Sequence, residues 1–228
     1  MSAIELWSYY LPERRVTNEQ LSERFPEWSA QKIAGKTGIT ERPVSAPGEL
    51  SSDMAVAAAE RLFETHGVDR SSIDFLIICS QSPDYYFPAT ACQVQDRLGL
   101  SKHTGALDIT LGCSGYVYSL AVAHGLITSG IAQRLLLITS ETITKFIGEQ
   151  DKGNLTLFGD AAAATLLSSD GVCRPSGFKM GTDGGGGKHI IMKRGGMRQP
   201  GFVDDPLAQD AFGNVRDPNY LHMDGPEV

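Results

Sequence analysis

The sequence predicts an α/β protein built around a layered, mostly parallel sheet. Continuous apolar runs typical of strands buried on both faces alternate with helix-like segments along the first 170 residues. A hydrophobic share of 41% in 228 residues suffices for one sizeable core, or for two small domains that share an interface.

The first third of the chain contains one expected strand and three expected helices. Thr17 or Asn18 is the expected N-cap of the first helix, and Gly38 ends the second. In the third, apolar residues recur at helical spacing until Gly67. These elements are a strand over 3–13 closed by Pro12, and helices over 17–25, 29–38 and 51–67.

The middle of the chain carries the strand and helix alternation that indicates the layered fold. The run AAAATLLSSD is ambiguous by composition, and we assign it to a strand because it is short and bounded by FGD and SDG. The expected elements are strands over 73–81, 104–110, 134–141 and 161–170, and helices over 87–100 and 113–130.

Beyond residue 170 the sequence changes character and becomes rich in Gly, Pro, Asn and Asp. The glycine run lacks the G-x-x-x-x-G-K-[ST] pattern, so a turn between strands is favoured over a phosphate-binding loop. The expected features are strands over 176–184 and 188–196, a long loop over 197–219, and a tail over 220–228 that resembles the start of an element.

Composition and charge exclude several classes of protein. The net charge of −7 argues against nucleic-acid binding, and no apolar run reaches the roughly 18 residues that span a membrane. The N-terminus shows no signal-peptide pattern, so cytoplasmic residence is expected. The four cysteines form no C-x-x-C pair, which predicts free thiols and no metal site.

Cys113 is the candidate nucleophile. It lies at the start of the apolar helix expected over 113–130, which we expect to be buried all round. A helix N-terminus favours thiolate over thiol, and Gly112, Ser114 and Gly115 leave room for a substrate carbonyl. The alternative is that cysteine is a small, often buried residue with no chemical role. Ser114 is a weak rival, because GCSGY misses the G-x-S-x-G pattern, and none of the five histidines can be assigned as a partner base.

Six segments in order resemble the β-ketoacyl-acyl-carrier-protein synthase III family of the thiolase superfamily. These are SYYLPERRVTNEQL (8–21), KTGITER (36–42), FPATACQVQDRLG (87–99), DITLGCSGYVYSL (108–120), LFGDAAAATLL (157–167) and YLHMDGPEV (220–228). The resemblance implies a thiolase-like layered fold of two similar halves and a homodimer. Residues 1–170 would be the N-terminal βαβαβαββ half, and residues 171–228 the beginning of an incomplete C-terminal half with a long cap loop.

The resemblance also implies a reaction. Cys113 would take an acyl group from acyl-coenzyme A or acyl-carrier protein, and a decarboxylating malonyl-acyl-carrier protein would then attack it in fatty acid biosynthesis. These thioesters are substrates, and no cofactor is implied. Cys113 matches the family's nucleophile position, and Phe87 matches a residue that reaches toward the neighbouring subunit's acyl pocket. Lys36, Lys152 and Trp28 fall in or near positions that bind the substrate.

Two departures from the family pattern leave alternatives open. The catalytic histidine and asparagine motifs, H-Q-A-N and G-N-T-S, do not occur, so we expect a fragment of a longer synthase with incomplete activity. Lys32 stands at the family's tryptophan position and Lys152 at its arginine position, and lysine does not stack as arginine does. The alternatives are a secondary-metabolite ketosynthase or acyltransferase with a carrier-bound or specialised donor, and a non-catalytic synthase-like partner subunit.

Overall fold

The structure is a computed structural model that describes residues 2–171, 173–210 and 213–228. The chain divides into two compact units. Unit 1 comprises Met1–Arg14, Ser45–Thr142 and Asp160–Met180, and unit 2 comprises Arg15–Val44, Ile143–Gly159 and Gly181–Val228. The domain boundary expected at residue 170 stays a prediction.

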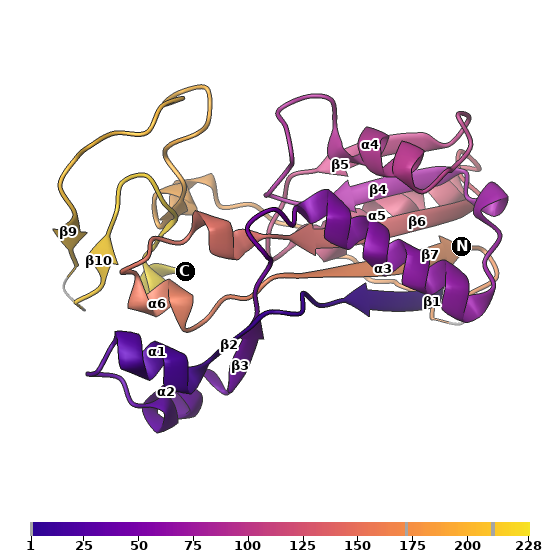
Figure 1. Ribbon diagram of the computed structural model, residues 1–228. Coiled ribbons are helices and arrows are strands. Elements are labelled where there is room, and N and C mark those ends of the chain that lie inside the picture. Colours follow the sequence, from indigo (N-terminus) through magenta and orange to yellow (C-terminus); the bar gives the residue numbers. More distant parts are fainter. Residues whose placement is uncertain (1, 172, 211–212) are drawn as a thin grey trace. The chain divides into compact units, whose positions relative to one another are not determined.

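Unit 1 is built on a five-stranded sheet with the order β1-β7-β6-β4-β5 (Figure 1). The strands are β1 (Ala3–Tyr10), β4 (Phe75–Cys79), β5 (Gly105–Ile109), β6 (Arg134–Glu141) and β7 (Ala161–Ser168). Strand β4 pairs in parallel with β5 and β6, whereas β7 pairs antiparallel with β6 and β1. The sheet is therefore mixed but mostly parallel, as expected: β1, β4, β5 and β6 run in one direction, and β7 runs against them.

Helices cover both faces of this sheet. They are α3 (Ser51–His66), α4 (Thr90–Arg97) and α5 (Gly115–Thr128). Along β4, Leu76 and Ile78 belong to the core beneath α3 and α4, whereas Ile77 belongs to the core beneath α5. Alternation along a fully buried strand explains why its sequence is apolar throughout. The chain order of these elements confirms the expected βαβαβαββ half.

Helix α5 is buried on one face only. Ser119, Leu120 and Ala123 are buried against the sheet, but Val117 and Val122 are 46% and 39% exposed. The expectation that this helix is buried all round was wrong. Its apolar residues encircle the helix, and nothing in the described part of the chain covers the outer side.

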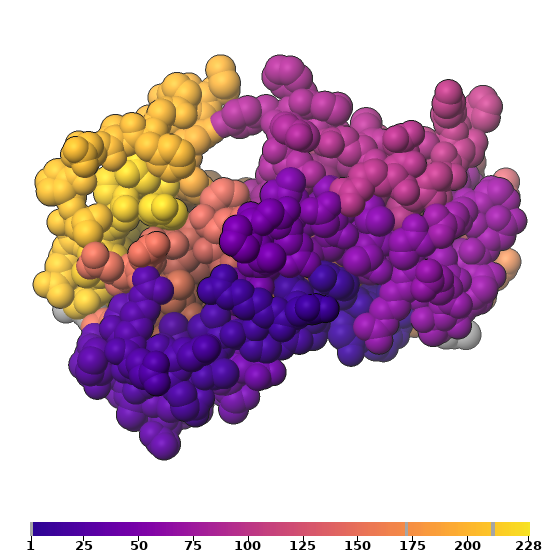
Figure 2. Space-filling view, viewed as in Figure 1, coloured from indigo at the N-terminus to yellow at the C-terminus, as the bar shows by residue number. Residues whose placement is uncertain are grey.

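Unit 2 contains short elements. Its helices are α1 (Asn18–Arg24), α2 (Ala30–Thr37) and α6 (Lys152–Leu155), and its strands are β2 (Arg15–Thr17), β3 (Glu41–Pro43), β8 (Ile190–Ile191), β9 (Ala208–Gln209), β10 (Val215–Arg216) and β11 (His222–Met223). Thr17 caps α1 through a reciprocal pair of hydrogen bonds with Gln20, and Gly38 ends α2 in the left-handed region, with a φ of 71°. Helices α1 and α2 lie at the surface, in indigo at the lower left of Figure 2.

The region beyond residue 176 was predicted less well. No strand forms over 176–183, and the strand expected over 188–196 is reduced to β8, which pairs with β11 in the tail. The glycine run forms a 3-10 turn over Gly184–Lys188, where the carboxylate of Asp183 accepts a hydrogen bond from the Gly185 amide. Glycine-rich and proline-rich segments offer little apolar surface, and such surface is what fixes a strand in a sheet.

Candidate active site

Cys113 lies where three parallel strands end. Strands β4, β5 and β6 share a register in which Cys79 is paired with Ile109 on one side and Thr139 on the other. Their carboxyl ends therefore meet at one edge of the sheet, which is where open α/β sheets place their ligand sites. The turn from β5 to α5 begins at this edge and carries Cys113.

The turn exposes the Cys113 side chain to solvent. The Gly115 amide donates a hydrogen bond of 2.7 Å to the Gly112 carbonyl oxygen, which closes the turn. Helix α5 begins at Gly115 with Ser114 as its N-cap, so Cys113 precedes the helix that was expected to start at it. A thiol in this position is reachable by a substrate and adjoins the amino end of a helix.

Two glycines near Cys113 are closely approached by the side chains of other residues. A Cβ added to Gly112 would lie 2.4 Å from Oε1 of Gln81, and one added to Gly115 would lie 2.4 Å from Sγ of Cys79. On the side where a Cβ would project, Gly112 and Gly115 are thus approached by the side chains of Gln81 and Cys79. Cys79 Sγ also donates to the Leu111 carbonyl oxygen at 3.3 Å.

Glu141, at the end of β6, is the carboxylate that anchors this edge. It accepts hydrogen bonds from the backbone N–H of Gln81 at 2.6 Å and from the Ser82 hydroxyl at 2.8 Å. Burial raises the pKa of Glu141, and these hydrogen bonds oppose the rise. Sequence reasoning missed Cys79, Gln81 and Glu141, since only the pairing of β4, β5 and β6 brings them to one edge.

The FPATACQ segment is tied to the strand that leads to the nucleophile. The carboxylate of Asp108, in β5, accepts hydrogen bonds of 2.7 Å from the amides of Thr90 and Ala91 at the start of α4. This contact satisfies helix amides that would otherwise lack partners. Phe87 precedes this helix and is 85% exposed.

In unit 2, the structure brings Trp28, Lys36 and Lys152 together, as the resemblance implied for a binding site. The ammonium groups of Lys36 and Lys152 lie 5.2 and 5.7 Å from the centroid of the Trp28 indole, and that of Lys32 lies at 5.4 Å. We call these four residues the Trp28 cluster. Lys152, which is buried, also donates to the Glu27 carboxylate at 2.9 Å.

The charge balance of the Trp28 cluster favours an anionic ligand. The hydrogen bond from Lys152 lowers the pKa of Glu27, which supplies a single negative charge beside three ammonium groups. An indole ringed by cations offers both an aromatic face and positive potential. Such a surface suits a phosphate-bearing or otherwise acidic thioester carrier.

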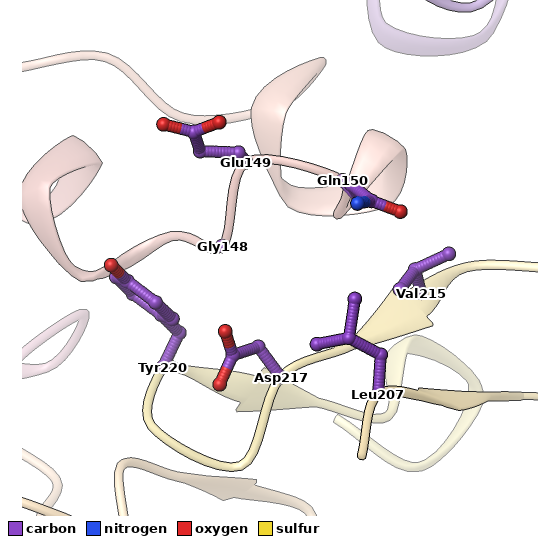
Figure 3. A pocket seen from close by; sticks show the side chains of 7 residues that line it. All are labelled: Gly148, Glu149, Gln150, Leu207, Val215, Asp217 and Tyr220. Carbon is purple, nitrogen blue, oxygen red and sulfur yellow. The ribbon is translucent and has the colours of Figure 1, made fainter. Parts of the chain in front are cut away.

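A pocket of about 240 Å³ lies in unit 2 and contains none of the candidate site residues predicted from the sequence (Figure 3). Its lining residues are Gly148, Glu149, Gln150, Leu207, Val215, Asp217 and Tyr220. Throughout the described ranges, no group of three His, Cys, Asp or Glu side chains is placed to hold a metal ion. Nor does any helix there combine the length and apolar character needed to cross a bilayer.

A cysteine presented at the carboxyl edge of a mixed sheet, in the turn before α5, defines an α/β protein with a candidate nucleophile. The family model for 3-oxoacyl-[acyl-carrier-protein (ACP)] synthase III matches residues 107–184, which include Cys113. A crystal structure of a 3-oxoacyl-(acyl-carrier-protein) synthase III is 44% identical, with a TM-score of 0.96 over 100% of this chain and 68% of that one. The chain belongs to the 3-oxoacyl-acyl-carrier-protein synthase III family.

Two curated relatives agree with this assignment. The β-ketoacyl-[acyl-carrier-protein] synthase III of Caldanaerobacter subterraneus subsp. tengcongensis is 38% identical over 84% of this chain and 57% of its own length. That of Roseiflexus sp. strain RS-1 is 36% identical over 100% of this chain and 66% of its own. The chain thus spans less than two thirds of the length of either curated relative.

Proposed function

We propose that the protein is a condensing enzyme of the 3-oxoacyl-acyl-carrier-protein synthase III type that acts in fatty acid biosynthesis. The observation that carries the proposal is the exposed Cys113 in the turn before α5, within the segment that the family model matches. Residues 1–170 would supply the half that bears the nucleophile, and residues 171–228 the start of the second half.

The proposed chemistry consists of two steps that meet at Cys113. In the first, its sulfur attacks the carbonyl carbon of an acyl thioester, a carbon–sulfur bond forms, and the carrier thiolate leaves. In the second, a malonyl thioester loses carbon dioxide, and the resulting enolate carbon attacks the acyl-cysteine. The Cys113 sulfur is expelled, and a β-ketoacyl thioester is released.

The Trp28 cluster would receive the carrier of the acyl group. Its indole and its net positive charge suit the phosphates of coenzyme A or the acidic surface of an acyl carrier protein. Trp28, Lys36 and Lys152 are therefore the residues to which we assign substrate binding. No cofactor takes part in this scheme, since the substrates are thioesters.

We also propose a cytoplasmic homodimer. Strand β5 lies at one edge of the sheet and Phe87 is largely exposed, so both are open to a second copy of the chain. The four cysteines are free, which fits a reducing compartment.

A condensation assay on the full-length protein tests the proposal. Acyl-coenzyme A or acyl-carrier protein is mixed with malonyl-acyl-carrier protein, and the β-ketoacyl product is detected by mass spectrometry. Product is expected from the wild type and from Cys92→Ala, which removes another exposed cysteine, but not from Cys113→Ala.

The same assay separates the alternatives. Product formed only with long-chain or aromatic donors would favour a secondary-metabolite ketosynthase. An acyl adduct without condensation would indicate bare acyl transfer, because the decarboxylative step is then missing. No adduct with any donor would contradict the proposed enzyme and favour a non-catalytic partner subunit.

A further inference from the structure

Two side chains from the end of β4 enclose the turn that carries Cys113. Cys79 is the last residue of β4, and Gln81 lies two positions further along the chain. The side chains of both residues approach the turn, Cys79 at Gly115 and Gln81 at Gly112. Neither residue belongs to the chemistry of the proposed reaction, yet both touch the backbone next to the nucleophile.

Gln81 contacts the turn directly before Cys113. A Cβ at Gly112 would lie 2.4 Å from Gln81 Oε1 and 3.2 Å from its side-chain carbonyl carbon, so the glutamine amide rests on the bare Cα of this glycine. Gly125 of α5 differs, because a Cβ added there would have nothing within 4 Å. A side chain at Gly112 would therefore have to displace the end of the exposed Gln81 side chain.

Cys79 holds the other side of the turn. Its thiol donates to the Leu111 carbonyl oxygen at 3.3 Å, and its sulfur fills the space that a side chain at Gly115 would need. Burial raises the pKa of Cys79, which keeps this thiol protonated and able to donate. The turn is therefore fixed on both sides of Cys113 by one strand end.

Glu141 holds the backbone of Gln81 in place. One carboxylate oxygen accepts from the backbone N–H of Gln81 at 2.6 Å, and the other accepts from the Ser82 hydroxyl at 2.8 Å. The Ser82 hydroxyl oxygen also accepts from the Thr142 amide at 2.9 Å. The segment after β4 is thus attached to the end of β6 at three points, which gives Gln81 a rigid base.

We propose that Gln81, anchored by Glu141, is a positioning residue that holds the Gly112–Cys113 turn in the geometry that presents the Cys113 sulfur. The inference rests on the proposed role of Cys113 as nucleophile and adds a residue that acts through the turn. It predicts that Gln81 and Gly112 form one energetic unit, since an alanine at Gly112 would displace the Gln81 amide.

Alkylation of Cys113 by iodoacetamide, followed by peptide mass spectrometry on the full-length protein, tests this proposal without any substrate. Gln81→Ala is expected to lower the Cys113 labelling rate about fivefold, because the sulfur is then no longer held at the amino end of α5, where a thiolate is favoured. Gly112→Ala should lower it by a similar factor, and the double variant should match either single one. Gln81→Met, which keeps the length of the side chain, should restore most of the rate.

Two other exposed cysteines and one exposed glutamine of the same chain serve as controls. Labelling of the exposed Cys92 and Cys173 should stay constant in every variant, and Gln31→Ala, an exposed glutamine of α2, should leave Cys113 unchanged. The proposal is overturned if Gln81→Ala labels Cys113 at the wild-type rate, if the Gln81 and Gly112 effects simply multiply, or if Gln81→Met behaves like Gln81→Ala. A wild-type protein that condenses no acyl donor would instead count against the proposed function, whatever these rates are.

Discussion

At the scale of single residues, Arg42 of the KTGITER segment is a buried cation. It is 2% exposed, and its guanidinium donates to the Thr156 carbonyl oxygen and, at 2.8 Å, to Asn18 Oδ1. No carboxylate within the described ranges lies close enough to pair with it, and burial lowers its pKa. Its role is therefore to satisfy the carbonyl end of α6 and the start of α1.

Arg42→Lys should destabilise the protein although the charge is kept. A lysine ammonium cannot reproduce the planar set of donors, so we expect a loss of about 2 kcal/mol in the free energy of unfolding. Urea denaturation measures this loss. Arg198→Lys, at an exposed arginine, serves as the matched control and should change little; an equally small effect at Arg42 would refute the structural role.

Glu141 gives the stability of the protein a predictable dependence on pH. Burial is the main reason that the pKa of Glu141 is raised in the folded state. Its stabilising contribution to the free energy of unfolding is therefore fully present at pH values below its unfolded pKa of about 4.5. That contribution is lost as pH rises through the folded pKa. The glutamine of the Glu141→Gln variant cannot ionise. The free energy of unfolding of this variant minus that of the wild type should therefore increase as pH rises above about 4.5. Denaturation curves over this range check the sign, and a difference that falls with pH would contradict it.

At the scale of elements, the two glycines of α5, Gly115 at its first position and Gly125 near its end, differ in the space around them. A Cβ at Gly115 would meet Cys79 Sγ at 2.4 Å and Leu111 Cβ at 3.3 Å, whereas Gly125 has open space. Gly115→Ala should therefore cost about 1–3 kcal/mol in the free energy of unfolding through overpacking. Gly125→Ala should instead add about 0.5–1 kcal/mol, because alanine is the better helix former. Thermal or urea unfolding compares the two, and stabilisation by both would show that the turn does not press on Cys79.

The Trp28 cluster joins Trp28, which precedes α2, to lysines of α2 and α6, and it yields a kinetic prediction. Trp28→Ala should raise KM for the acyl donor roughly two- to fivefold with little change in kcat, because a cation–aromatic surface is lost outside the bond-making step. Steady-state kinetics of the full-length enzyme measure both parameters. Trp7→Ala, at an exposed tryptophan of β1, is the control; equal effects at both positions would argue against a carrier site at Trp28.

At the scale of the whole molecule, the sequence predicts the parts of the fold that apolar patterns determine. The strand expected over 134–141 coincides with β6, and the helix expected over 51–67 corresponds to α3, ended by Gly67 in the left-handed region. Short elements escaped prediction because partners far along the chain hold them. Strands β2 and β3 are stabilised by pairing with each other, and Asp151, which caps the short helix α6, is held by an ion pair with Arg216.

From the sequence, the candidate site could be predicted only where a recognisable motif contains a site residue, as at Cys113. Cys113 stands out because a thiol among small residues follows a strand and precedes a helix. The roles of Gln81 and Glu141 depend on which strands become neighbours, and neither their type nor their spacing reveals that. The one available signal was the pair of glycines around Cys113, which mark a close approach; the approaching groups prove to be protein side chains.

The central claim of the account is that Cys113 is the sulfur that accepts the acyl group. The most direct test mixes the full-length protein with acyl-coenzyme A or acyl-carrier protein, digests it under conditions that preserve thioesters, and locates the acyl mass by peptide sequencing. The account predicts that the acyl group resides on Cys113 and that Cys92 and Cys173 remain free. An acyl group found on either of those exposed cysteines, with Cys113 unmodified, would contradict it.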